Sequence, residues 1–185
     1  KKKTMATTAA VTTKWAIDPT HSEISFKVKH LVISTVTGYF REFEGGINQT
    51  GDTWEGSKAY FSAKTDSVDT NQKDRDNHLR SDDFFNAEKY PQLKFESTSI
   101  KKTGDDKYKM AGNLTIRDIT KPVDLEATFL GEATDPYGNH KAGFEITGKI
   151  NRKEFGLKWN AVTEAGNVVV SDEVRLNLNV QVVKQ

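Results

Sequence analysis

The side chains best suited to acid–base chemistry are concentrated in one segment, DNHLRSDDFFNAEKY, at residues 76–90. His78 and Asp82 are four residues apart, a spacing that places both on one face of a helix. Such a pair could work as a general base and its orienting carboxylate, with Asp83 as an alternative partner. The same spacing is typical of a solvent-facing ion pair. Because no nucleophile or metal ligand lies nearby in the sequence, the ion pair is the favoured interpretation.

The same segment has the features of a short helix with an apolar end. Ser81 is predicted to cap the helix N-terminus, since its hydroxyl can accept a hydrogen bond from a backbone N–H of the residues that follow. The two aspartates after it would then favour the positive end of the helix dipole. Phe84 and Phe85 remain and require burial. We therefore expect a helical insertion around residues 71–90 that caps or lines one end of the molecule.

The rest of the chain offers little catalytic or metal-binding chemistry. The four histidines, His21, His30, His78 and His140, are far apart, and there is no cysteine or H-E-x-x-H motif. His21 and Ser22 are neighbours, and neighbours on a strand point to opposite faces. The sequence therefore predicts no catalytic residue, no metal site and no cofactor.

Composition excludes several classes of partner. The 27 basic and 26 acidic side chains nearly cancel, so the net charge of +1 gives no footprint for nucleic acid or an anionic membrane. No apolar run reaches the roughly 18 residues of a membrane span. We expect one domain at residues 15–184, preceded by a disordered or tag-like arm at 1–14. A native start at Met5 implies a cytoplasmic protein, and a removed signal peptide a periplasmic one.

The elements that must position these residues are mainly strands. Apolar and polar residues alternate most clearly in five segments, at 23–30, 107–117, 123–129, 142–150 and 174–182, and more weakly at 36–40, 59–63 and 93–95. The alternation slips between Phe40 and Phe43, which suggests a β-bulge. Short turn sequences separate the runs. About eight antiparallel strands with one apolar face each favour an all-β fold, a sheet closed into a barrel.

The inward face of this barrel mixes large apolar residues with small ones. The small positions either leave volume for a ligand or fit the taper of a filled barrel, and the sequence does not separate the two. Because the face is almost wholly apolar, any ligand should be apolar too. The small residues are Gly38, Ala59, Ala63, Gly112, Ala127, Ala142 and Gly148.

Several long motifs, in fixed order over residues 15–184, closely resemble the YceI-like family of polyisoprenoid-binding, bacterial lipocalin-like proteins. They are WAIDPTHSEISFKVKHLVISTVTGYF, NHLRSDDFFNAEKYPQLKFEST, GNLTIRDITKPV, GFEITGKINRKEFGLKWN and VSDEV. The resemblance implies an eight-stranded antiparallel lipocalin-like barrel and no catalytic residues. It also implies that a long isoprenoid lipid or quinone is bound, transported or stored in an apolar tunnel.

We expect the tunnel to be lined mainly by apolar side chains, with His30 or Arg152 as hydrogen-bond partners of a polar head group. The broad outer faces of such a barrel would also suit a homodimer. Two other functions stay open at this point: an enzyme that acts on an apolar substrate through His78, and a stress-response interaction module with a filled barrel. The expected ligand-binding residues are Phe26, Val28, His30, Val36, Phe40, Phe61, Phe84, Phe85, Leu93, Phe95, Met110, Leu114, Phe129, Phe144, Ile146, Arg152 and Leu178.

Overall fold

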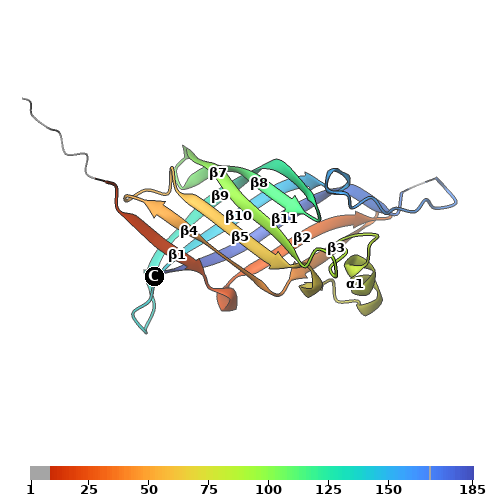
Figure 1. Cartoon of the computed structure of the whole chain (residues 1–185), viewed down its shortest axis with the longest axis horizontal. Coiled ribbons are helices and arrows are strands. Elements are labelled where there is room, and N and C mark those ends of the chain that lie inside the picture. The colour runs from red at the N-terminus through yellow and green to blue at the C-terminus, as the bar shows by residue number, and fades with distance from the viewer. Residues whose placement is uncertain (1–8, 167) are drawn as a thin grey trace, which may run out of the picture.

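The computed structural model describes residues 9–166 and 168–185 and shows a closed antiparallel β-barrel (Figure 1). Eight strands form the ring, and the pairing of Trp15 with Lys184 helps to join its last strand to its first. The predicted all-β, lipocalin-like barrel is thus confirmed. In ring order the strands are β1 (Thr12–Ile17), β4 (Phe43–Thr50), β5 (Lys58–Lys64), β7 (Gln92–Gly104), β8 (Lys107–Ile116), β9 (Ile119–Thr134), β10 (His140–Asn151) and β11 (Val170–Lys184).

Three further strands extend the barrel at one end. The C-terminal end of β11 pairs with β1, and the preceding part of β11 pairs with β2 (Glu23–His30). β1 and β2 therefore lie one after the other along the same edge of β11. The 3₁₀ turn η1 (Pro19–His21) separates them. In the same way β3 (Ser34–Phe40) precedes β4, and β6 (Val68–Asp69) follows β5 after the 3₁₀ turn η2 (Thr65–Ser67). The sheet therefore continues as β11–β2–β3–β6.

The predicted β-bulge between Phe40 and Phe43 is wrong. The structure has a strand break there, because β3 ends at Phe40 and pairs with β2 and β6, whereas β4 begins at Phe43 and pairs with β1 and β5. The slip in alternation marks a corner at which the chain changes partners. Such a corner and a bulge give the same sequence signal, because both shift the inward parity by one residue.

The predicted helical insertion is present but shorter, as α1 (Lys73–Arg80). Gln72 caps its N-terminus by accepting from the backbone N–H of Arg75. Ser81 lies at the opposite end, where its hydroxyl donates to the carbonyl of His78 at 2.6 Å, so the predicted N-cap role of Ser81 is wrong. Within residues 9–166 and 168–185, no helix is long and apolar enough to cross a membrane.

The barrel begins earlier than the sequence indicates. β1 starts at Thr12, and residues 12–14 already pair with β4, so they belong to the barrel and not to the predicted arm. Residues 1–8 of that arm lie outside the described part of the chain. Trp15, in the middle of β1, is buried against the core, which anchors this first strand.

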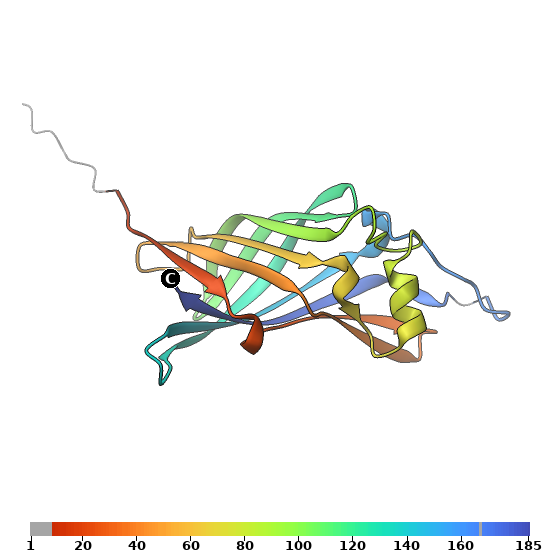
Figure 2. The same cartoon turned by 60° about the horizontal axis from the view of Figure 1, so that its bottom comes forward.

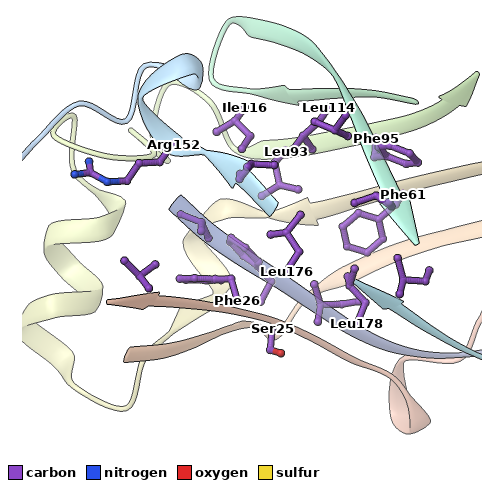
Figure 3. A pocket seen from close by; sticks show the side chains of 18 of the residues that line it. Ser25, Phe26, Phe61, Leu93, Phe95, Leu114, Ile116, Arg152, Leu176 and Leu178 are labelled. Atoms are coloured by element: carbon purple, nitrogen blue, oxygen red, sulfur yellow. The ribbon is translucent and has the colours of Figure 1, made fainter. Parts of the chain in front are cut away.

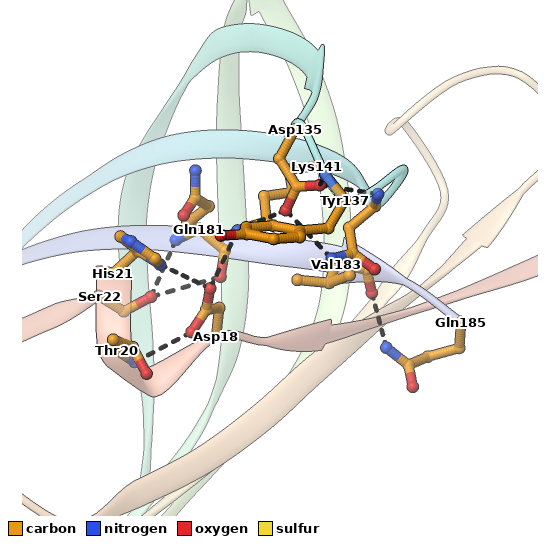
Figure 4. A network of polar contacts seen from close by, with 11 residues as sticks. Asp18, Thr20, His21, Ser22, Asp135, Tyr137, Lys141, Gln181, Val183 and Gln185 are labelled. Atoms are coloured by element: carbon orange, nitrogen blue, oxygen red, sulfur yellow. Dashed lines mark hydrogen bonds and ion pairs between the residues drawn. The ribbon is translucent and has the colours of Figure 1, made fainter.

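A polar network ties β1, β10 and β11 together near the C-terminus (Figure 4). Asp18 caps η1 through the backbone N–H of Thr20 at 3.0 Å and pairs with the ring of His21 at 2.8 Å. The ammonium of Lys141 lies 3.3 Å from Asp18 and 3.5 Å from Asp135. Hydrogen bonds from Asn139, with Lys141 adding to them, lower the pKa of Asp135 to about 2. The hydrogen bond from His21 likewise lowers the pKa of Asp18.

This network predicts loss of stability in acid. A carboxyl with a lowered folded-state pKa stabilises the fold above its ordinary pKa and stops doing so as the pH falls through the lowered value. For Asp135 that window runs from about pH 4 down to about pH 2. We expect Asp135→Asn to lower the melting temperature at neutral pH, and the difference from the wild type to vanish across this window. Thermal unfolding followed by circular dichroism measures the melting temperature of both proteins at each pH. A difference that stays constant down to pH 2 would contradict the assignment.

Candidate functional site

The inside of the barrel holds an apolar cavity of about 570 Å³. Side chains from all around the barrel line it, and Figure 3 shows Phe61, Phe95 and Leu178 gathered around one space while Ser25 points away. Volumes of roughly 300–1,000 Å³ are typical of small-molecule sites. The inward positions therefore enclose room for a ligand, and the barrel is not filled.

Of the residues predicted to bind ligand, all but Phe129 line this cavity. Phe129 packs instead in an aromatic cluster with Phe144 and Trp54, at ring-centroid distances of 5.5 and 5.7 Å. Alternation alone could not separate these cases, because β9 and β10 shift register next to Phe144. Predicted residues on the cavity wall are Phe26, Val28, His30, Val36, Phe40, Phe61, Phe84, Phe85, Leu93, Phe95, Met110, Leu114, Phe144, Ile146, Arg152 and Leu178.

The aromatic cluster closes the end of the cavity away from α1. Trp54 is its centre and contacts Phe144 edge-on at 4.9 Å and Trp15 at 5.2 Å. The indole of Trp15 in turn donates to the side chain of Gln49 at 3.0 Å, so its one polar group is satisfied. Trp15, Trp54 and Phe144 are 3%, 5% and 8% exposed, so these rings leave little of this end open to solvent.

The α1 end carries the polar part of the wall. Besides apolar groups, the cavity there is lined by Thr70, Asp74, Arg75 and His78, which are not among the individually predicted ligand-binding residues, although the insertion at 71–90 was expected to cap or line one end of the tunnel. Their alternation signal is absent because they lie on α1 and the loop before it. We call this end the mouth. Its charged groups lie at one end of a space that is otherwise lined mainly by apolar side chains, as expected for a ligand with a polar head and an apolar chain.

Phe84 and Phe85 are buried at the mouth, as the apolar end of their segment requires. Phe85 packs edge-on against Phe40 at 5.6 Å, and Phe84 lies 5.1 Å from the ring of His78. Arg117 anchors the segment by donating a hydrogen bond to the carbonyl of Phe84 at 2.9 Å. The segment after α1 is therefore fixed at the mouth of the cavity by both apolar and polar contacts.

The predicted pairing of His78 with Asp82 is wrong. The helix ends at Arg80, so Asp82 leaves the helical face and pairs with Arg117 at 2.8 Å. Nε2 of His78 lies 2.8 Å from Asp83, the alternative partner, and its ring packs edge-on against Trp159 at 4.7 Å. The spacing rule failed because it holds only while the helix continues.

The two residues predicted to bind a head group differ sharply. Arg152, only 3% exposed, donates to the backbone carbonyls of Leu157, Trp159, Val170 and Ser171 at 2.6–3.3 Å. Burial lowers the pKa of Arg152, and nearby Asp172 opposes that effect. Four of its five N–H groups are thus engaged with backbone carbonyls, and Nη2 also lies 3.8 Å from Asp172, so this geometry favours a structural role over the predicted head-group role. In the part of the chain that the structure describes, the ring of His30 has no hydrogen-bond partner.

Glycines on the inward face let large side chains lie flat against the wall. A Cβ on Gly38 would meet the ring of Phe26 at 2.2 Å, and one on Gly148 would meet Leu125 at 2.4 Å. The space at these glycines is therefore occupied by neighbouring side chains and not by the cavity itself. Their effect on the cavity is indirect, because each large side chain folded against the wall leaves the centre open.

Gly38→Ala is expected to reduce the cavity. The new methyl group forces the ring of Phe26 off the wall and into the open centre, at a cost of about 1–3 kcal/mol for an overpacked interior. We expect a lower melting temperature and weaker binding of a fluorescent prenyl probe. Gly104→Ala is the matched control, since its Cβ would meet nothing closer than 3.8 Å. Equal probe binding by both variants would show that Phe26 does not limit the space.

Residues 15–182 match the family described as "YceI-like domain". The chain is 42% identical over 179 residues to Protein YceI of Escherichia coli O17:K52:H18, covering 96% of this chain and 90% of that protein. Burkholderia cenocepacia BcnA superposes with a TM-score of 0.78 at 22% identity, covering 89% of this chain and 98% of BcnA. A polyisoprenoid binding domain from Saccharophagus degradans gives 0.67 at 15% identity, with coverages of 92% and 98%. These last two likenesses show the fold.

Proposed function

The chain belongs to the YceI-like family, and from that premise we propose that it is a non-enzymatic protein that binds one isoprenoid-type lipid in its barrel and stores or transports it. The observation that carries the proposal is the apolar cavity of about 570 Å³, lined by the buried Trp54 cluster at one end and by its charged groups at the mouth. A filled barrel, which the rival interaction module would have, is not what the structure shows. The polyisoprenoid binding named for the Saccharophagus degradans domain supports the choice of lipid.

The cavity suits a chain with one polar end, such as a polyprenyl lipid or an isoprenoid quinone. Burying each CH₂ group contributes roughly 0.8 kcal/mol, so a chain of several isoprene units offsets the cost of ordering it. At the mouth, His30 and Arg75 lie on the wall and offer ring or guanidinium nitrogens to a head group. Arg75 already donates to Thr70 through Nε and Nη2, which fixes the direction of its guanidinium.

Extraction of the purified protein into organic solvent, followed by mass spectrometry, tests the proposal. We expect a lipid with an isoprenoid chain, in a stoichiometry near one per protein, and competition between that lipid and a fluorescent prenyl probe. Recovery of straight-chain fatty acids alone, with no displacement of the prenyl probe by an isoprenoid quinone or a polyprenol, would overturn the isoprenoid assignment. A protein delipidated and refolded serves as the control for lipid acquired during purification.

The pair of His78 and Asp83 favours one rival function, an enzyme acting on an apolar substrate, because it could serve as base and orienting carboxylate at the mouth. His78→Ala distinguishes the two. A binding protein should retain its lipid with an affinity within about threefold of the wild type, a difference below 1 kcal/mol. An enzyme should keep its binding but lose chemical conversion of the extracted lipid, which mass spectrometry detects as a mass change over time.

A further inference from the structure

Two loops from distant parts of the sequence meet beside the mouth (Figure 2). One is the β2–β3 turn at residues 31–33, and the other comprises residues 160–166 and 168–169, before β11. The backbone N–H of Leu31 donates to the carbonyl of Val169 at 2.9 Å and joins them. Together they expose four apolar side chains, the mouth patch: Val32 (67% exposed), Ile33 (86%), Val162 (68%) and Val168 (46%).

The β2–β3 turn is built at the expense of backbone strain. Leu31 and Val32 have φ values of 53° and 66°, in the left-handed region that asparagine and glycine occupy with least strain. A β-branched valine is among the residues least suited to this region. The strain is not compensated by burial, because Val32 is exposed. Apolar residues at strained and solvent-facing positions indicate a surface selected for contact and not for stability.

The mouth patch is continuous with the cavity. Lys29 and His30, just before the turn, and Val169 and Val170, just after Val168, all line the cavity wall. An apolar lipid resides in a bilayer, and its transfer through water is strongly unfavourable. A patch that enters the bilayer at the rim of the cavity would let the chain pass from one apolar medium to the other without crossing water.

Charge close to the patch is small and of both signs. Lys27 and Lys29 precede the β2–β3 turn, whereas Glu164 lies in the second loop. Arg41 lies at the far end of β3, where it pairs with Asp69 at 2.9 Å. Basic side chains beside an inserted apolar turn contact lipid phosphates favourably. The opposite end also exposes Leu130 and Tyr137, but there the aromatic cluster around Trp54 closes the barrel. The mouth patch therefore combines exposed apolar groups, two neighbouring lysines and direct continuity with the cavity wall.

We propose that the mouth patch docks this end of the barrel onto a lipid bilayer, with Val32, Ile33, Val162 and Val168 inserted at the level of the head groups. The purpose of docking, loading the cavity, rests on the proposed function. Docking itself does not, since it depends on the surface alone. The near-zero net charge is consistent with contact through one small apolar patch and not through the whole surface.

Co-sedimentation with vesicles of phosphatidylcholine and a minority of phosphatidylglycerol tests docking. We expect the wild type to sediment with the vesicles and the variant Val32→Ser with Ile33→Ser to bind at least about tenfold more weakly, because two inserted side chains are lost. The matched control is Leu130→Ser with Tyr137→Ser at the closed end, which should bind like the wild type. Equal loss in both variants, or a wild type that stays in the supernatant, would overturn the proposal.

A second measurement separates docking from the proposed function. A short prenyl probe that is soluble without vesicles should bind the patch variant as it binds the wild type, while transfer of a long prenyl lipid from vesicles should be at least about tenfold slower. Unchanged transfer by the patch variant would overturn docking as the loading route. Vesicle binding that depends on the patch, in a protein that binds no prenyl probe, would support docking and count against the proposed function.

Discussion

The variant Ile146→Trp with Leu178→Trp is expected to lose lipid binding while its barrel stays folded. These two residues pair across β10 and β11, and both line the cavity without being fully buried. Two indoles at this level fill the open centre of the barrel. Each methylene excluded from the cavity removes roughly 0.8 kcal/mol of binding free energy, so exclusion of only two already weakens binding by about tenfold. Exclusion of several isoprene units should abolish detectable binding.

The matched control uses the neighbouring pair on the same two strands. Glu145 and Asn179 also face one another across β10 and β11, but both are exposed on the outer surface. Glu145→Trp with Asn179→Trp adds the same two indoles outside the barrel and should leave probe binding unchanged. Titration with a fluorescent prenyl probe, together with the melting temperature, measures both variants. Retained binding in the Ile146 and Leu178 variant would place the ligand outside the cavity.

The faces used in this experiment could be predicted from sequence because strand alternation fixes them. In residues 142–150 and 174–182 the apolar parity never slips, and each residue other than glycine that was predicted to face inward there lines the cavity or packs in the core. Barrel closure followed from the same signal, since unpaired edges are unfavourable for one-sided strands. What alternation leaves open is the amount of free volume, because side chains such as Phe26 lie over glycine and not over the centre.

The mouth could not be predicted in the same way. The range of α1 depends on which residue provides the first cap, and Gln72 provides it while Ser81 ends the helix. Because the helix ends before Asp82, this carboxylate does not pair with His78. It accepts a hydrogen bond from Arg117, 35 positions away. The contacts of Trp159 and Arg75 depend equally on loops without periodicity. Local rules thus locate a cluster of polar residues but do not determine their partners.

Arg152 illustrates how a charged residue on a cavity wall can be structural. It begins the 3₁₀ turn η3 (Arg152–Phe155) after β10, and its guanidinium faces back toward the segment that leads into β11. Four carbonyls of residues 157–171 accept from it, and Phe155 beside it is among the most deeply buried side chains. One guanidinium therefore fixes both ends of the connection between β10 and β11, including the part that carries Val162 and Val168.

Arg152→Met should consequently be the most destabilising single substitution among those discussed. Methionine fills most of the same space but leaves buried carbonyls without donors, each at a cost of about 1–3 kcal/mol. Since water can reach some of them, we expect a net loss of about 3 kcal/mol and a melting temperature lower by roughly 6–12 °C. Limited proteolysis should show faster cleavage within residues 157–171 before global unfolding.

Two control variants test whether the effect of Arg152→Met comes from the lost backbone hydrogen bonds. Arg175→Met removes an exposed arginine whose hydrogen bond is to Glu173, and it should change the melting temperature little. Arg152→Lys keeps the charge but offers one nitrogen where the guanidinium reaches four carbonyls, so it should restore only a small part of the stability. Full recovery by lysine would mean that charge near Asp172 is what matters. If Arg152→Met weakened ligand binding and left the melting temperature unchanged, Arg152 would instead be a hydrogen-bond donor to the ligand head group, because such a donor must be free of the backbone carbonyls.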